Sequence, residues 1–560
     1  MRTATTIIGL AALLATVACS GDTSSGETAA ADDTPTEEEG TDSSTADSSS
    51  DADGEAGAPA GYLAEADADF GSGGVLEIQL DYDTAEAGGL DPMLADTARS
   101  WMLFDLVYET LTTVDADMAV QPGLAESWDM PDDTTYVFTL RDDAVFSNGR
   151  AVTADDVAGS LRRIGEVGST WTPQLGPVSS IEATGDLEVT VTLDAPHTPF
   201  LAALATSQAG VMPIAEIEAG EVDPATDLLG SGLLVATDHR QDEFWSFEPN
   251  PHHPLADELG FSSVEMEIVA EEATRLAALR DGSADLAVLN SVDAPDLLSG
   301  TDEAAVVSQT NTDFYYLMIN SRREGSPITD EAVRFAVNSA IDRAQLIDIA
   351  FAGQSAPTGV TPAVLPDACD PAALPSAQAT PEDISSALAD AGAEDLSLSL
   401  LIYDDPTQAQ MAQIMQQQLA GHGITIEIEQ MDYVSYSALV YEPDPADFDL
   451  AMSWFAGYAD PSMVTGWWNP TQAVFSSVFM EDDPDVNALI AEGRATPPGD
   501  ERAATFTDLC AAVDENAEMV PLLSRSTILG FRTDQLSPSF YAAEGYGNFL
   551  RLLTEFRAAP

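Results

Sequence analysis

Alternating apolar and polar side chains give the first clear element of this chain. Residues 136–141 (YVFTLR) alternate in this way, which predicts a half-buried β-strand. A short segment begins at Phe146, and Asn148-Gly149 then predicts a tight turn, because glycine adopts positive φ at little steric cost. The pattern therefore predicts a strand followed by a second short extended segment that folds back on itself.

A helix is predicted directly after this turn. Thr153 stands at the N-cap position, where its hydroxyl can accept from free backbone amides, and Asp156 three residues later forms a variant capping box. Val157, Leu161 and Ile164 then recur at helical spacing. An ordinary hairpin followed by a helix would give the same pattern, so periodicity alone does not reveal a function here.

The same periodicities predict further elements along the chain. The helical residues include Met411 and Met415, which we interpret as core residues and not as a ligand-binding surface. Strands are expected at residues 75–80, 188–193 and 424–428, and helices at residues 330–343 and 408–421.

The start of the chain resembles an export signal. Arg2 precedes an apolar run at residues 7–17, which is shorter than the about 20 residues needed to span a bilayer. The run ends in TVAC, which is similar to a bacterial lipobox apart from Thr16, where leucine is usual. We expect residues 1–18 to be a signal peptide and Cys19 to carry the lipid, with plain secretion as the alternative.

Residues 19–72 contain almost no side chains that could form a core. This segment holds fifteen acidic residues and no basic one. Such a composition does not offset the conformational entropy of the chain, so we expect an acidic, disordered tether.

Net charge narrows the range of partners. The 560 residues carry a formal charge of −77, and all nineteen basic residues are arginines. Residues 73–560 alone retain a charge of −63, so the acidity belongs to the folded part as well. Nucleic-acid binding requires clustered cations, so this surface argues against it. The acidity fits a saline or acidic exterior, where ions screen the self-repulsion.

Residues 124–161 carry a highly specific string. It reads L-A-E-S-W, then Y-x-F-x-L-R, then F-x-N-G, then V-T-A-x-D-V. This string closely resembles the signature of the extracellular solute-binding proteins, family 5, that serve peptide- and nickel-type ABC importers. Further blocks follow in the family's order from about residue 75 to about residue 553, including a Y-E-x-L helix at residues 105–111, a strand at 264–269 with a helix through Leu276, and a crossing strand at 314–320.

The resemblance implies an α/β fold with two lobes, the type II, cluster C-like fold of periplasmic binding proteins, with an extra subdomain in the first lobe. Ligand is then held between the lobes. The implied boundaries are residues 73–112, 196–310 and 529–560 for lobe I, 113–195 for the extra subdomain, and 311–528 for lobe II.

The function that the resemblance implies is solute binding for an ABC importer. The protein would capture a peptide-like compound, an oligosaccharide or another organic solute, and would pass it to the permease and ATPase complex. It would act as a monomer on the outer face of the cell membrane, without cofactor or metal. A sensor lipoprotein that presents solute to a receptor is the alternative. A secreted hydrolase is disfavoured, since the sequence has neither an H-E-x-x-H nor a G-x-S-x-G pattern.

The segment SWFAGYADP, residues 453–461, bears on the ligand. In the peptide-binding branch the similar string has an aspartate that pairs with the α-ammonium group of the peptide, and this chain has Gly457 there. A buried ammonium without a carboxylate is costly. Free peptides are therefore disfavoured, and Gly457→Asp is expected to improve peptide affinity. Asp460 matches a second acidic position, which we interpret as a turn residue or as a displaced cation contact.

Aromatic side chains provide further candidates for the ligand site. Tyrosine and tryptophan combine a flat apolar surface with a polar tip, which suits sugars and ring systems, although some will be core residues. The expected ligand-binding residues are Trp454, Gly457, Tyr458, Asp460, Tyr82, Trp171, Asp313 and Phe314.

Two cysteines remain if Cys19 is lipidated. In an oxidising exterior, Cys369 and Cys510 are expected to form a disulfide, with two independent buried thiols as the alternative.

Overall fold

The computed structural model describes residues 73–84, 89–95, 97–365, 367–442, 445–455, 457–473, 475–542 and 547–558. The expected signal peptide, Cys19 and the acidic tether lie outside these residues. None of the helices in the described ranges combines the length and the apolar composition that crossing a membrane requires.

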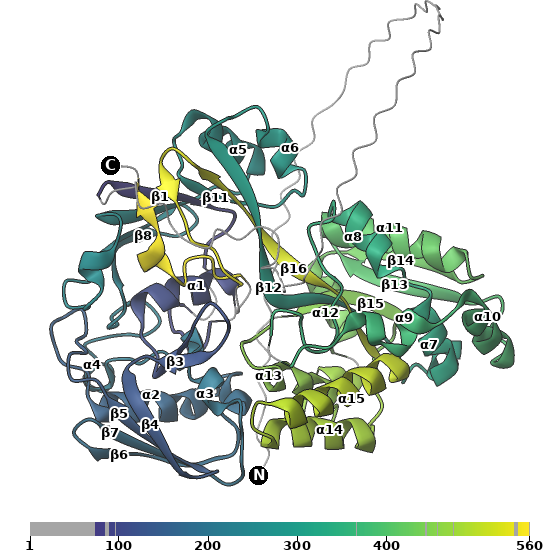
Figure 1. The fold of residues 1–560 in the computed structure, drawn as a ribbon, viewed down its shortest axis with the longest axis horizontal. Coiled ribbons are helices and arrows are strands. Elements are labelled where there is room, and N and C mark those ends of the chain that lie inside the picture. Colours follow the sequence, from purple (N-terminus) through teal and green to yellow (C-terminus); the bar gives the residue numbers. More distant parts are fainter. Residues whose placement is uncertain are drawn as a thin grey trace, which may run out of the picture. The chain divides into compact units, whose positions relative to one another are not determined.

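A ten-stranded mixed sheet runs through the protein (Figure 1). Strand β1 is parallel to its neighbours β10 and β11, and β13 is parallel to β14 and β15. The strands, in sheet order, are β14 (Thr425–Met431), β13 (Ser397–Tyr403), β15 (Leu450–Phe455), β12 (Ala304–Ile319), β16 (Met519–Arg532), β11 (Leu286–Leu289), β1 (Val75–Leu80), β10 (Ser263–Ile268), β9 (Phe244–Pro249) and β8 (Leu234–Arg240).

Two long antiparallel strands, β12 and β16, form the centre of this sheet and connect its two halves (Figure 1). Strands β1 and β8 to β11 come from residues expected in lobe I, and β13 to β15 from residues expected in lobe II. The pairing of β12 with β16 shifts in register twice, between Thr310 and Phe314 and between Tyr315 and Tyr316. Strand β12 is also longer than the expected strand at 314–320, because its first half continues into lobe I.

A separate four-stranded sheet falls within residues 113–195. Its order is β4 (Ala125–Asp132), β5 (Thr135–Leu140), β7 (Glu188–Leu193) and β6 (Val178–Gly185). The expected capping box is confirmed at the start of α2 (Ala154–Glu166), where the Asp156 amide donates to the Thr153 hydroxyl and the Thr153 amide donates to the Asp156 carboxylate. Two-stranded sheets pair β2 (Thr112–Val114) with β3 (Val120–Pro122), and β17 (Leu536–Ser537) with β18 (Arg557–Ala558).

Helices pack beside the sheets (Figure 1). The remaining α-helices are α1 (Ala98–Val107), α3 (Phe200–Ala203), α4 (Ile214–Ala219), α5 (Glu272–Asp281), α6 (Ala294–Leu298), α7 (Glu331–Ser339), α8 (Arg343–Ala350), α9 (Pro375–Gln378), α10 (Pro381–Asp390), α11 (Pro406–Ala420), α12 (Tyr433–Val440), α13 (Ser462–Thr465), α14 (Pro484–Ala495) and α15 (Asp500–Asn516).

The bounds predicted for two helices were wrong. The chain leaves α1 at Tyr108, which is extended, because the Gly232 amide donates to the Val107 carbonyl at 2.8 Å and holds another segment against the helix end. The helix expected at 330–343 ends at Ser339. A new helix starts at Arg343, because the Asp342 side chain accepts the Gln345 amide as an N-cap.

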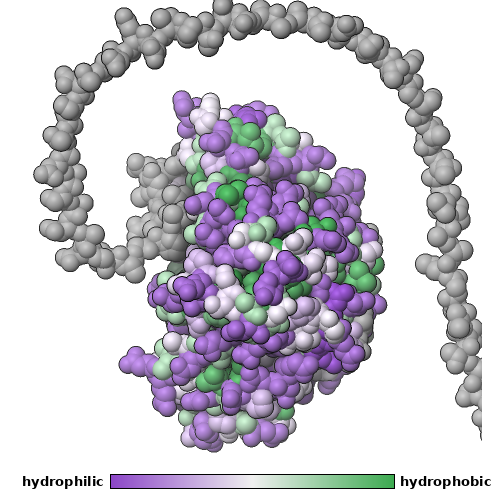
Figure 2. Space-filling model, turned by 90° about the vertical axis from the view of Figure 1, so that its right-hand side faces the viewer, coloured by the Kyte–Doolittle hydropathy of each residue, from purple (hydrophilic) through white to green (hydrophobic). Residues whose placement is uncertain are grey.

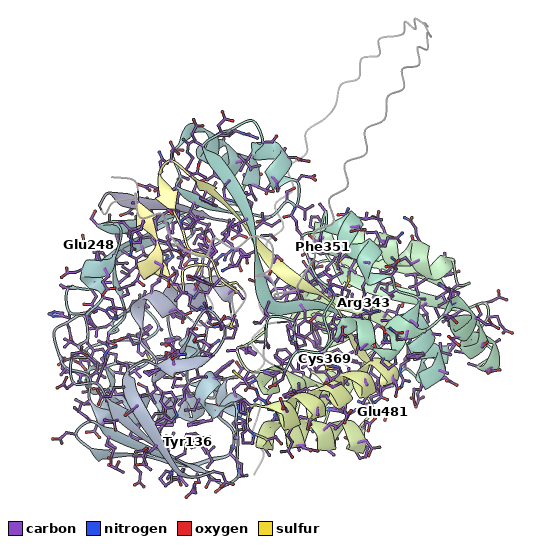
Figure 3. The ribbon with its side chains drawn as sticks, viewed as in Figure 1. Tyr136, Glu248, Arg343, Phe351, Cys369 and Glu481 are labelled. Carbon is purple, nitrogen blue, oxygen red and sulfur yellow. A yellow bond between two sulfur atoms is a disulfide. The ribbon has the colours of Figure 1, made fainter. Side chains whose placement is uncertain are left out.

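The core contains the two methionines that were interpreted as core residues, and both are buried. Hydrophilic side chains cover much of the face in Figure 2, and hydrophobic ones form small separate areas there. Cys369, labelled in Figure 3, is joined to Cys510 in a disulfide with a Cα–Cα distance of 6.3 Å.

Candidate functional site

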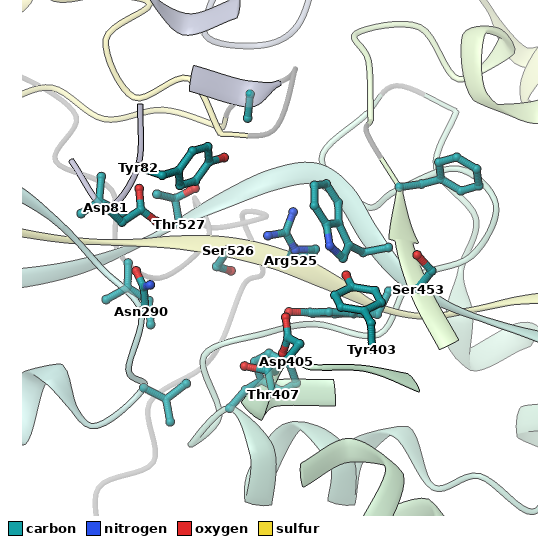
Figure 4. Close-up of a pocket in the computed structure, with 18 of the residues that line it drawn as sticks. Asp81, Tyr82, Asn290, Tyr403, Asp405, Thr407, Ser453, Arg525, Ser526 and Thr527 are labelled. Carbon is teal, nitrogen blue, oxygen red and sulfur yellow. The ribbon is translucent and has the colours of Figure 1, made fainter. Parts of the chain in front are cut away.

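A cavity of about 860 Å³ lies where several strands of the main sheet end. Strands β1 and β11 from lobe I, and β13 and β15 from lobe II, run out at this place. Carboxyl ends of parallel strands are where open α/β sheets hold their ligands. The lining residues labelled in Figure 4 are Asp81, Tyr82, Asn290, Tyr403, Asp405, Thr407, Ser453, Arg525, Ser526 and Thr527.

Arg525 is a central charged group of the cavity. It extends from β16, pairs through Nη1 with Oδ2 of Asp313 on β12, and lies over the Trp454 ring at 3.8 Å from the ring centroid. Burial lowers the pKa of Arg525, but the charge of Asp313 together with the contributions of Tyr315 and Tyr403 outweighs it, so the net shift is upward. Burial raises the pKa of Asp313, and Arg525 opposes that shift. The guanidinium is thus held charged and in place from two sides.

A second ion pair lines the cavity from lobe I. Arg99, in the first turn of α1, donates from Nε and Nη2 to Oδ1 of Asp81 at 3.1 and 2.7 Å. Its guanidinium also lies 4.9 Å from the centre of the Tyr82 ring. Burial and the like charge of Arg525 lower the pKa of Arg99, whereas Asp81 raises it, and the net shift is upward. The two arginines therefore interact electrostatically across the cavity.

Aromatic rings form much of the remaining wall. Tyr403 meets Tyr433 edge-to-face at 5.4 Å, and Tyr433 is 60% exposed. Phe455 stacks on Tyr316 at 4.7 Å and on Trp467 at 3.6 Å. Burial raises the pKa of Tyr316 well above its usual value, so its hydroxyl remains protonated. The cavity thus offers flat apolar surface beside two arginine–carboxylate pairs.

Trp454 and Tyr82, two of the expected ligand-binding residues, line this cavity, and their contact with a ligand stays a prediction. Asp313 lies behind Arg525 as its fully buried counter-ion, and Phe314 is buried against Trp468 at 6.3 Å. Neither Asp313 nor Phe314 lines the cavity.

Trp171 and Tyr458 are both buried and pack edge-to-face, with ring centroids 5.1 Å apart. The pair joins residues expected in the extra subdomain to residues expected in lobe II, and neither ring lines the cavity. Nearby, Gln174 Nε2 donates to the Met463 carbonyl at 3.1 Å, and the Thr198 amide donates to the Arg494 carbonyl at 2.9 Å. These two aromatic residues are contacts between lobes in this structure.

Gly457 differs most from the expectation, and Asp460 takes the turn position that was its first interpretation, two residues before the start of α13 (Ser462–Thr465). A Cβ built at Gly457 would lie 1.9 Å from the Thr312 carbonyl oxygen, so the position has no room for any side chain. Asp460 accepts from Arg502 Nη1 at 2.8 Å and from the Ser462 amide at 2.8 Å. Arg502 is almost fully buried, so it holds Asp460 as its counter-ion, outside the cavity lining.

The sequence reading missed Arg525, Arg99, Tyr403 and Asp405. Arg525 had a usable signal, because it is a rare cation inside a largely apolar segment, LLSRSTIL. Asp405 had a weaker one, since it follows β13 directly and its carboxylate caps α11 by accepting the Gln408 amide at 2.9 Å. Among the described residues, no group of three or more histidines, cysteines or acids is arranged to hold a metal ion.

The model of the family described as "Bacterial extracellular solute-binding proteins, family 5 Middle" matches residues 119–475. A probable D,D-dipeptide-binding periplasmic protein of Escherichia coli K12 is 25% identical over 469 residues, covering 79% of this chain and 87% of that protein. The nickel-binding periplasmic protein of the same organism is 24% identical over 464 residues, covering 78% and 86%.

Solved structures share the fold. An ABC transporter substrate-binding protein, CtaP, of Listeria monocytogenes superposes with a TM-score of 0.76 at 19% identity, covering 87% of this chain and 100% of that one. The unliganded, open form of the murein tripeptide-binding protein MppA gives a TM-score of 0.70 at 18% identity, covering 89% and 99%. Members of this family bind and transport substrates and are not enzymes. The chain belongs to the bacterial extracellular solute-binding proteins of family 5.

Proposed function

We propose that this protein is the solute receptor of an ABC importer. It captures a small organic solute in the cavity between lobe I and lobe II and delivers it to a membrane permease. The observation that carries the proposal is the meeting of strand ends from both lobes at one cavity of about 860 Å³, a size suited to a small-molecule ligand. Relatives named for binding dipeptides, nickel and glutathione support the same role.

Capture works through closure of the lobes. Only β12 and β16 cross the middle of the main sheet in the described part of the chain, so the lobes can rotate about this crossing. A ligand favours the closed state by its differential affinity for that state. The permease would then recognise the closed form.

The receptor is held at the outer face of the cell membrane through Cys19. The apolar run and the TVAC string support this anchor. Cys19→Ala should leave the precursor uncleaved or release the protein from membranes. Mass spectrometry of the mature N-terminus tests the assignment, and an unmodified start at Ser20 or later would contradict it.

A thermal-shift screen against peptides, oligosaccharides, opine-like compounds and metal chelates tests the receptor role. A solute at about 100 times its Kd should stabilise the protein by about 2.7 kcal/mol. Small-angle scattering should show compaction at the same concentration. A radius of gyration that stays unchanged under a saturating thermal shift would refute capture by closure.

A further inference from the structure

Arg525 pairs with the buried Asp313 and also presents part of its side chain to the cavity. We propose that this guanidinium receives a carboxylate of the solute, so that the receptor selects carboxylate-bearing organic compounds. The proposal rests on the receptor function and names the chemical class of the solute.

Other arginines in this chain show what a purely structural ion pair looks like. Arg502 pairs with Asp367 at 2.7 Å and with Asp460 at 2.8 Å, and its side chain is 2% exposed. Arg525 pairs with one acid and keeps 26% of its side chain exposed on the cavity wall. If Arg525 served only as the counter-ion of Asp313, its side chain would not need to be exposed to the cavity.

The contacts of Arg525 fix its orientation and leave room for a ligand. Trp454 packs against the face of the guanidinium, the Tyr315 ring lies 5.6 Å from it, and Asp313 accepts from Nη1. A guanidinium carries five N–H donors in a plane, and a planar carboxylate can accept two of them in parallel. An aromatic ring on the face of the guanidinium does not block that edge. Arg525 is therefore preorganised for a two-oxygen anion.

The surroundings of Arg525 make an anion more favourable still. Arg99 also lines the cavity and bears the same charge as Arg525, so an anion placed between the two guanidinium groups would reduce their mutual repulsion. The chain as a whole carries −77, so an anionic solute finds few positive positions on this protein. Arg99 and Arg525 bring two guanidinium groups to the cavity, where the carboxylates of Asp81 and Asp405 also lie.

The cavity offers less to a cationic group. The Thr312 carbonyl fills the space beside Gly457, so no acid stands at that position. Asp81 is paired with Arg99, and Asp405 caps α11. The carboxylate is thus the charge by which the solute is primarily held, and the tyrosine-rich wall covers its apolar body.

Two sources of such a carboxylate are the C-terminus of a peptide and a non-peptide acid such as a sugar acid. In the test, the full chain is purified in detergent and incubated with four equimolar pools. The pools are tri- to pentapeptides as free acids, the same peptides as C-terminal amides, oligogalacturonic acids, and the methyl esters of those acids. Bound compounds are separated by gel filtration and identified by mass spectrometry.

We expect retention from one of the acid pools, with its blocked counterpart retained about tenfold less or weaker still, because a hydrogen bond to a charged group is lost. The pool that is retained identifies the source. Equal retention of acid and blocked forms, or no retention from either acid pool, would overturn the proposal.

Variants separate ligand binding from structural pairing. Arg525→Gln should abolish retention of the acid pool but leaves Asp313 buried without a partner, so it can also damage the fold. The double variant Arg525→Gln/Asp313→Asn removes both charges, and it should fold yet retain no acid. Asp313→Asn alone should retain the acid at least as well as wild type. Arg240→Gln, at an exposed surface pair with Glu243, is the control.

Full retention by the double variant would overturn the role of Arg525. Failure of the carboxylate proposal can be distinguished from failure of the receptor function. If an ester or amide binds and still compacts the protein, the receptor function stands and the carboxylate preference falls. If nothing binds in any pool or in the thermal-shift screen, both fall.

Discussion

The tight contact at Gly457 gives a prediction that reverses an expectation from the sequence. An aspartate at this position was expected to restore an ammonium site for peptides. A Cβ there would lie 1.9 Å from the oxygen and 2.0 Å from the carbon of the Thr312 carbonyl. The absence of a carboxylate is therefore a packing requirement of this backbone, and Gly457→Asp should not create a peptide site.

The stability that a side chain at position 457 should cost follows from the geometry of the contact with Thr312. Real Cβ atoms essentially never come within 3.0 Å of another heavy atom, so about 1.1 Å must be gained by moving backbone. The atom in the way is a main-chain carbonyl of β12, which cannot rotate aside as a side chain would, although Thr312 lies where the pairing of β12 with β16 is interrupted. Overpacking costs typically about 1–3 kcal/mol, and we expect Gly457→Ala to reach about 3 kcal/mol. This corresponds to a fall in Tm of about 3–6 °C.

Calorimetry of wild type, Gly457→Ala and Gly300→Ala provides the assay. A Cβ at Gly300 meets nothing within 4 Å, so that variant should melt with wild type. Isothermal titration of Gly457→Asp with trialanine and N-acetyl trialanine should show no gain over wild type. The reasoning fails if Gly457→Ala melts like Gly300→Ala, or if Gly457→Asp gains peptide affinity that acetylation removes.

Three further outcomes are expected. Replacing Cys369 and Cys510 together by serine should cost on the order of 4–5 kcal/mol in the chain-entropy model, and a reducing agent should then have no further effect on Tm; an unchanged Tm would contradict the disulfide. Burial raises the pKa of Glu109, but the hydrogen bond from His253 and the charge of Arg141 contribute to a larger opposite shift, so the net pKa is lowered. The stability that Glu109 contributes is therefore present above its ordinary pKa and is lost as the pH falls through the lowered value. Glu109→Gln should accordingly destabilise the protein at pH 7, and less and less as the pH falls below the ordinary pKa of Glu109, in denaturant titrations; a loss that does not change with pH would refute this. Trp171→Ala removes the ring against Tyr458 and should cost about 3–5 kcal/mol and enlarge the unliganded radius of gyration, whereas unchanged scattering would show that this contact does not hold the lobes.

Local signals made much of the fold predictable. The alternation at residues 136–141 became β5, and Thr153 with Asp156 capped α2, because both depend on neighbours within a few residues. The helix expected at 105–111 failed because Tyr108 is drawn out of α1 by contacts with residues 230–232, which are more than 100 positions away.

The site was harder to predict because it too depends on contacts between residues that are far apart in the sequence. Trp454 and Tyr82 were named from their residue type and sequence context. The pairing of Arg525 with Asp313 joins residues 212 positions apart, and only the register of β12 against β16 brings them together. Asp460 was named as a ligand-binding candidate because its neighbours in the sequence give no indication that Arg502, 42 positions away, is its partner.

The double crossing of the main sheet by β12 and β16 has a practical consequence. Strands β13 to β15 and helices α7 to α15 all lie in the sequence between these two crossings, so the described part of lobe II is suspended from a single two-stranded ribbon. Such a ribbon bends most readily where its register shifts, between Thr310 and Phe314 and again between Tyr315 and Tyr316, because the regular pairing is interrupted there. Opening then reduces to one angular coordinate, and a single pair of spin labels, one on each lobe, is enough to follow the whole motion.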